Sequence, residues 1–151
     1  MPPPQRSTKS GREPSQARRT SARFVLELAR ALHAHGTPAH ELERVLSQVA
    51  SRLGLRAVFF STPTSIMIGF GEQSEQEVRL LRVEPGRPNL GHLGTLGDIT
   101  RAVLHEGLSA VVGLKRMQAL FAEPPRWPGW LRVVAHVLAS AAVACFLRLH
   151  V

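Results

Sequence analysis

The sequence predicts an α+β fold: a helical hairpin, a three-stranded sheet, two further helices and a C-terminal helix of membrane type. Apolar residues recur at helical spacing on both sides of a central segment, and between residues 55 and 83 the period changes to two. A third observation is a mainly apolar run over 133–147. With 151 residues, 44% of them hydrophobic, the chain can bury the core of one ordinary domain.

The first twenty residues are basic and rich in proline, serine and arginine, with almost no apolar side chains. A segment of this composition cannot bury enough surface to fold, so 1–20 is expected to be a disordered basic tail. It lacks the apolar stretch of a secretory signal, and its prolines argue against a mitochondrial transit peptide.

Two helices follow. The first is expected over 21–35 and ends at Gly36, because glycine favours the helix C-terminus. Thr37 as N-cap and Pro38 as first helical residue predict the start of the second, which ends at Gly54. The apolar stripes of these helices are Phe24, Val25, Leu28 and Leu32, and then Leu42, Val45, Leu46, Val49 and Leu53. The short connection predicts a helical hairpin.

Three strands are expected at 55–62, 64–71 and 77–83. Pro63 cannot donate a ladder hydrogen bond, so the residues around it should form a turn, a bulge or an edge. Both faces of the first strand carry apolar side chains, which predicts that the strand is covered on both sides. Two helices, over 90–105 and 110–121, complete the domain.

No motif in the chain predicts catalysis. The glycines at 91, 94 and 97 lack the lysine and the spacing of a phosphate-binding loop. The histidines around 33–40 have no cysteine or second acidic residue at metal spacing, so no metal and no cofactor are expected. No nucleophile elbow or catalytic triad is present, so the chain is not expected to be an enzyme. Glu43, at the edge of a helix stripe, is expected either to meet Arg56 or Arg82 or to stay solvated.

The C-terminal run decides between a soluble and a membrane protein. Residues 133–147 alone make about 22 Å of helix at ~1.5 Å per residue, which is less than the roughly 30 Å of a bilayer core. The segment from Trp130 to Val151 spans about 33 Å if Arg132 and Arg148 extend outward to the headgroups. Trp127 and Trp130 suit the membrane interface. The alternative is a buried C-terminal helix of a soluble domain. The lone cysteine, Cys145, is expected to be a small buried hydrophobe.

Several short motifs in a fixed order resemble the N-terminal part of the threonine/serine exporter family, over roughly residues 24–146. They are Gly36-x6-Glu43, Leu53-Gly54-Leu55, Ser61-Thr62-Pro63-Thr64, Leu81-Arg82-Val83-Glu84-Pro85-Gly86, Asn89-Leu90 and the Trp-Leu entry to the apolar run. The resemblance implies a cytoplasmic α+β domain at 21–126, a partial transmembrane helix at 127–151 and an inner-membrane location. Basic residues before Trp130 favour the same orientation.

The resemblance also implies a function. Family members export threonine and serine or a small dicarboxylate, so the implied partners are the lipid bilayer, membrane-embedded exporter helices or a partner subunit, and a small amino acid or organic acid. Recurrent polar positions of the family, for substrate or for structure, fall on Glu43, Thr62, Thr64, Arg82 and Asn89. Family members continue into further membrane helices where this sequence stops, so we expect a truncated subunit that does not transport alone.

The competing hypothesis is a soluble basic module that binds nucleic acid through its arginine-rich tail. The formal charge of +8 is compatible with such a partner. Aromatic residues are few, however, and no helix presents arginines in the pattern of a recognition helix. No nucleic acid is therefore expected as a partner.

Overall fold

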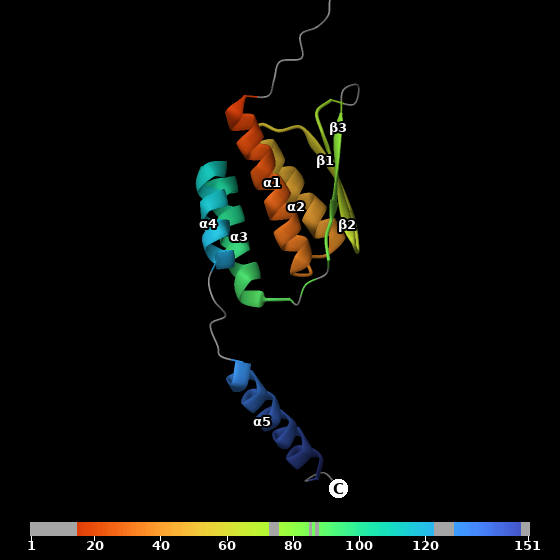
Figure 1. Ribbon diagram of the computed structural model, residues 1–151, viewed down its shortest axis with the longest axis vertical. Helices are drawn as coiled ribbons and strands as arrows, with labels where there is room; N and C mark the ends of the chain where they lie inside the picture. Colours follow the sequence, from red (N-terminus) through yellow and green to blue (C-terminus); the bar gives the residue numbers. More distant parts are fainter. Residues whose placement is uncertain (1–14, 73–75, 85, 87, 123–128, 149–151) are drawn as a thin grey trace, which may run out of the picture. The chain divides into compact units, whose positions relative to one another are not determined.

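A computed structural model describes residues 15–72, 76–84, 86, 88–122 and 129–148 of the chain, and within them it confirms the predicted α+β class (Figure 1). The elements are α1 (Gln16–Ala34), α2 (Ala39–Arg52), β1 (Ala57–Thr62), β2 (Ser65–Phe70), β3 (Glu77–Arg82), α3 (Leu90–His105), α4 (Ala110–Ala122) and α5 (Gly129–Arg148). The chain divides after Leu120 into two compact units, of which the second contains α5.

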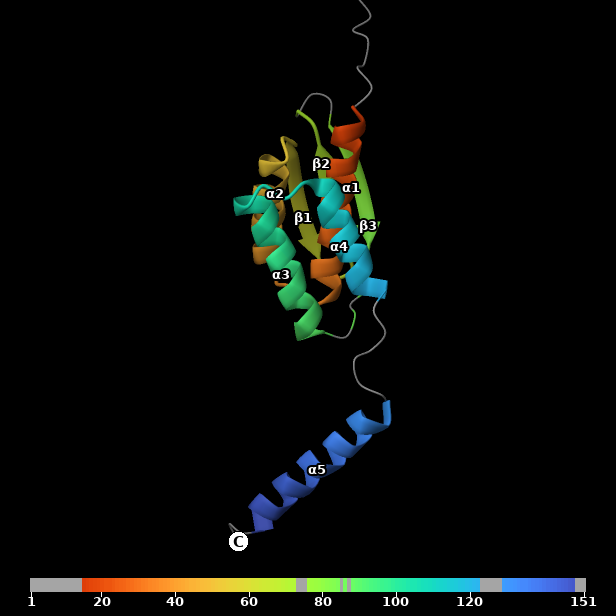
Figure 2. The same cartoon turned by 90° about the vertical axis from the view of Figure 1, so that its left-hand side faces the viewer.

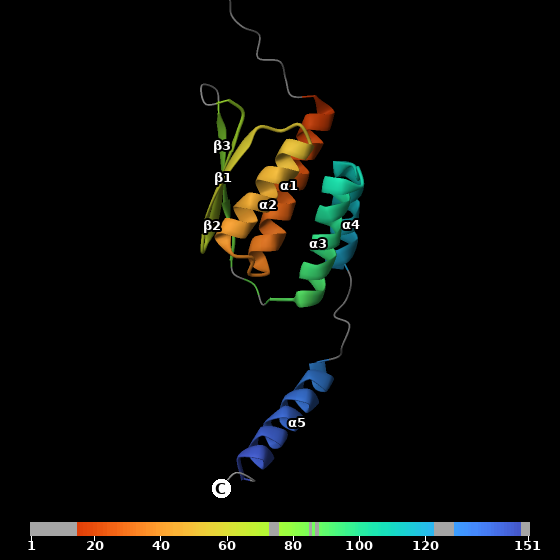
Figure 3. The ribbon, with the colours of Figure 1, turned by 180° about the vertical axis from the view of Figure 1, so that it is seen from behind.

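The first unit has three layers (Figures 1 and 3). An antiparallel sheet in the order β1-β2-β3 forms one outer layer, the α1–α2 hairpin the middle layer, and α3 with α4 the other outer layer. The middle layer therefore has two faces to bury. Its fully buried side chains include Phe24, Val25 and Leu28 of α1 and Leu42 and Leu46 of α2.

Helix α1 starts earlier than expected. The prediction of a disordered segment over 1–20 is wrong for residues 16–20, which are helical, while residues 1–14 lie outside the described part of the chain. Ser15 is the N-cap, and its hydroxyl accepts a hydrogen bond from the backbone N–H of Arg18 at 3.4 Å. The serine that caps the helix had been counted as part of a disordered composition.

The hairpin connection differs by one residue from the prediction. Gly36 has a φ of 85°, a conformation that favours glycine, and it ends the first helix as expected. The N-cap of α2 is Pro38 and not Thr37, and no side chain caps that helix end. The hydroxyl of Thr37 is buried without a hydrogen-bond partner among the described residues.

Within the described part of the first unit, the sheet is covered on one side only. Thr62 pairs with Ser65 across a two-residue turn, which accommodates Pro63 outside the ladder. Phe59, Ile66 and Ile68 face the hairpin and are buried. The prediction that both faces of the first strand are covered is wrong, because Val58 and Phe60 are 64% and 60% exposed.

Helix α4 approaches α1 closely through Gly113. A Cβ added at this glycine would lie 2.6 Å from the Cε2 atom of Phe24. Only a residue without a side chain fits at this crossing, since real Cβ contacts are longer. Gly97 in α3 is different, because an added Cβ would meet nothing within 4 Å.

Helix α5 has 20 residues, about 30 Å at ~1.5 Å per residue, and is long and apolar enough to cross a membrane. Trp130, Arg132 and Arg148 lie within it, whereas Trp127 lies outside the described residues. None of its described side chains is buried. Cys145 is exposed, so its prediction as a buried hydrophobe is wrong within this chain. The side chains of a core helix in a soluble domain would instead be mostly buried.

Candidate functional site at one end of the α+β domain

Four segments that are distant in the sequence meet at one end of the first unit (Figures 1 and 2). They are the end of α1, the start of α2, the β1–β2 turn and the connection from β3 to α3. The backbone N–H of Gly86 donates to the carbonyl of Ala34 at 3.1 Å, and that of Val83 to the carbonyl of Thr64 at 2.9 Å. We call this region the polar end.

Glu43 holds α2 against the β1–β2 turn. Its half-buried carboxylate accepts a hydrogen bond of 2.7 Å from the backbone N–H of Ser61. Neither of the two predicted alternatives, an ion pair with Arg56 or Arg82 or a solvated carboxylate, describes this contact with a backbone N–H, and Arg56 pairs instead with Glu72. The side chain therefore satisfies a backbone donor at the end of β1, which ties a helix to a strand.

Thr62 is held from two sides. The Nε2 atom of His33 lies 2.7 Å from the Thr62 carbonyl oxygen and donates to it, because a carbonyl can only accept. The Thr62 hydroxyl lies 2.7 Å from the Ser65 hydroxyl and accepts from the Ser65 backbone N–H at 3.1 Å. Sequence reasoning missed the contact of His33 with this turn, because no local pattern links residues that are 29 positions apart.

The other three recurrent polar residues lie around this turn and beyond it. Thr64 contributes its carbonyl to the bond with Val83, and Arg82 is exposed opposite Ser65. Asn89 is the N-cap of α3, where its side-chain oxygen accepts from the N–H of Gly91 at 3.0 Å and of His92 at 3.2 Å. The polar end thus brings Glu43, Thr62, Thr64 and Arg82 together, while Asn89 has a separate capping role.

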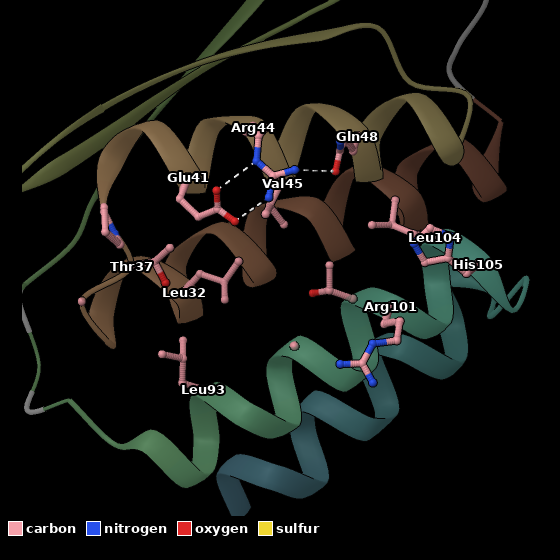
Figure 4. Close-up of a pocket in the computed structure, with 14 residues that line it drawn as sticks. Leu32, Thr37, Glu41, Arg44, Val45, Gln48, Leu93, Arg101, Leu104 and His105 are labelled. Carbon is pink, nitrogen blue, oxygen red and sulfur yellow. Dashed lines mark hydrogen bonds and ion pairs between the residues drawn. The ribbon is translucent and has the colours of Figure 1, made fainter.

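A cavity of about 630 Å³ opens beside the polar end, between the hairpin and α3 (Figure 4). Leu32, Val45, Leu93 and Leu104 give it an apolar lining. Its volume lies within the ~300–1,000 Å³ range of small-molecule sites. Thr37, whose hydroxyl has no partner among the described residues, lies at the end nearest the hairpin connection.

The α2 wall of the cavity carries a pre-arranged ion pair (Figure 4). The Nε and Nη2 atoms of Arg44 donate to the carboxylate of Glu41, the former at 2.9 Å, and Nη1 donates to Gln48 at 3.3 Å. The hydrogen bond from Arg44 lowers the pKa of Glu41, and the same bond raises the pKa of Arg44. Both pKa shifts favour the charged forms of the pair.

The α3 wall adds a second cation. Arg101 lines the cavity, and its Nη1 atom lies 3.3 Å from Oδ1 of Asp98. Both side chains of this ion pair are exposed to solvent. Gly97 faces the same space without a side chain. Each arginine at the rim is already paired with a carboxylate, so the apolar lining suits a small amphipathic molecule whose polar groups meet these ion pairs. Among the described residues, no group of histidine, cysteine or acidic side chains could hold a metal ion.

A folded α+β domain followed by an apolar helix long enough to cross a bilayer is an arrangement found in membrane proteins. Residues 23–151 match the family model described as "Putative threonine/serine exporter". The chain belongs to this family of transporters. The resemblance seen in the sequence motifs is thereby confirmed.

The relatives are much longer proteins. The chain is 31% identical over 126 residues to pheromone-regulated membrane protein 10 of Candida albicans, which is 82% of this chain and 11% of the relative. It is 29% identical over 123 residues both to the protein of that name in Saccharomyces cerevisiae and to an uncharacterized protein of Schizosaccharomyces pombe, in each case 80% of this chain and 16% of the relative. No solved structure matches the chain.

Proposed function

We propose that this chain supplies the cytoplasmic domain and one membrane helix of an exporter for threonine and serine or a small organic acid. The observation that carries the proposal is α5, a 20-residue apolar helix with no described side chain buried. Family membership supports transport as the activity. The basic residues before α5 support a cytoplasmic position for the α+β domain.

Transport requires more than α5. A substrate with ionised groups cannot cross hydrocarbon beside a single helix, because its polar groups need a bundle of helices around them. The remaining helices must come from other membrane segments, of the same polypeptide or of a partner subunit. In this proposal the α+β domain gates or assembles that bundle and does not itself enclose the path.

The insertion of α5 is tested by carbonate extraction of membranes that contain the full chain. Eight leucine, valine and phenylalanine residues of α5, at about −0.3 to −0.6 kcal/mol each, favour insertion by roughly 2–5 kcal/mol. An arginine near the centre costs about 2.5–3.5 kcal/mol. We expect the natural chain and Leu138→Ile to stay with the membrane pellet and Leu138→Arg to be extracted.

The orientation is tested in spheroplasts with a single accessible cysteine. In a Cys145→Ser background, Ser51→Cys on exposed α2 should react with a membrane-impermeant maleimide only after the membrane is permeabilised. Labelling of intact spheroplasts would reverse the orientation. A natural chain that stays in the supernatant would instead favour the soluble alternative and refute the proposal.

A further inference from the structure

The outer face of the sheet carries apolar side chains that stay exposed within the described part of the first unit, where only Gln76 lies over it, at Gly69. Every second residue of each strand points to this face. Its apolar residues lie in two rows of cross-strand neighbours, Val58–Gly69–Val78 and Phe60–Met67–Leu80. The exposed members are Val58, Phe60, Met67, Val78 and Leu80, each between 46% and 67% exposed. We call these five residues the outer apolar face. Contiguous exposed apolar groups of this kind mark an interaction surface.

The strands bring one kind of charge to this face, and just outside them Arg56 and Glu72 form an exposed ion pair. The other strand positions that point the same way are Thr62, Ser65, Gly69 and Arg82, so the only ionisable side chain among them is an arginine. Glu77 and Arg79 have the opposite parity and pair with each other at 2.7 Å. The whole chain has a formal charge of +8. An apolar surface bordered by arginine on a basic protein is complementary to anionic lipid headgroups above an acyl layer.

The size of the face argues against a second copy as the occupant. Three strands about 4.8 Å apart and six residues long at ~3.3 Å each make roughly 300 Å² of flat sheet. A standard protein interface takes about 800 Å² from each partner. Two copies of a chain with a net positive charge would also repel each other.

The outer apolar face needs only a low affinity for the bilayer, because in the proposed function the domain is tethered close to it. The segment between Ala122 at the end of α4 and Gly129 at the start of α5 can span at most about 25 Å. Whenever α5 lies in a bilayer, the α+β domain is confined to the zone beside that bilayer, and a weak contact is then populated through its high effective concentration.

We propose that the outer apolar face docks on the anionic surface of the membrane in which α5 is anchored. This inference rests on the proposed function. The sheet face is thereby turned toward the headgroups, and the polar end and the cavity keep a fixed orientation relative to the bilayer.

The test uses the full chain with Cys145→Ser, reconstituted in vesicles of phosphatidylcholine alone or with added phosphatidylglycerol. An NBD fluorophore is attached to Val78→Cys in the outer apolar face, or to Ser51→Cys on exposed α2 as the control. We expect blue-shifted and severalfold stronger emission at position 78 in the anionic vesicles only, and no change at position 51. Raising the salt concentration should reduce the difference.

Two further substitutions separate lipid docking from a general change in the protein. Leu80→Glu places a carboxylate on the outer apolar face at an exposed site and should abolish the blue shift, with folding checked by circular dichroism. Val111→Glu makes a comparable change on exposed α4 and should preserve it.

Three results would overturn the inference. Equal emission at position 78 in both vesicles, with the chain resistant to carbonate, would refute docking and leave the proposed function standing. Emission that rises with the protein-to-lipid ratio in neutral vesicles would indicate a second copy on the face. Extraction of the natural chain by carbonate would remove the anchor, and with it both proposals.

Discussion

The bond between Glu43 and Ser61 gives the sharpest test of the polar end. Replacing Glu43 by alanine leaves the backbone N–H of Ser61 without its partner. A hydrogen bond to a charged group contributes about 1.5–3 kcal/mol, and water can partly replace it here because both residues are half-buried. We expect Glu43→Ala to lower the free energy of unfolding of the α+β unit by roughly 1–2 kcal/mol. Glu43→Gln keeps an acceptor oxygen and should lose only about half as much.

The matched control is Glu27→Ala, the same exchange on a neighbouring helix. Glu27 forms only an exposed pair of 3.9 Å with Arg30, so its loss should cost no more than about 0.5 kcal/mol. The measurement is urea unfolding of the full chain in detergent micelles, followed by hydrogen exchange in peptides of β1. If Glu43→Ala and Glu27→Ala were equally stable, or if glutamine were as costly as alanine at position 43, the hydrogen bond would not be the source of the stability.

Three further predictions concern single contacts. Asn89→Ala removes the N-cap of α3 and should cost about 1 kcal/mol in thermal unfolding, while Asn89→Asp should cost much less. Gly113→Ala forces a Cβ into the ring of Phe24 in α1 and should lower the free energy of unfolding by about 1–3 kcal/mol. Gly97→Ala has open space around it and should raise the free energy of unfolding by up to ~1 kcal/mol. Equal effects of the two substitutions would refute the packing explanation. In an NMR titration the pKa of Glu41 should lie below its ordinary value and return to it in Arg44→Gln. Because the folded-state pKa is the lower one, the pair stabilises the fold above the unfolded pKa and is lost as pH falls through the folded pKa.

Most of the element order could be predicted because it is encoded locally. The stripe of α1, the glycine at position 36 and the alternation in β2 each depend on neighbours a few residues away. The predictions that were wrong concern either the boundary of an element or what a side chain contacts. Ser15 was hidden in a polar segment, and the two apolar faces of β1 could not reveal that only one is covered inside this chain.

The polar end shows the same division between local and distant information. Asn89 stands before a helix and its capping role has a local signal. The partner of Glu43 is a backbone N–H 18 residues away, which any residue type except proline could supply at that position. Sequence motifs could identify Glu43 as a recurrent position, but only the packing of α2 on β1 shows that its carboxylate anchors a turn.

The α1–α2 hairpin lies between the two outer layers and packs against both of them (Figure 1). In the described first unit, α1 and α2 separate the sheet from α3 and α4 (Figures 1 and 3). A molecule in the cavity touches α2 and α3, whereas a surface on the far side of the sheet touches only strands. The two surfaces are connected both through the packed hairpin and through the connection from β3 to α3, so substitutions in the hairpin helices test how much of any coupling the hairpin carries.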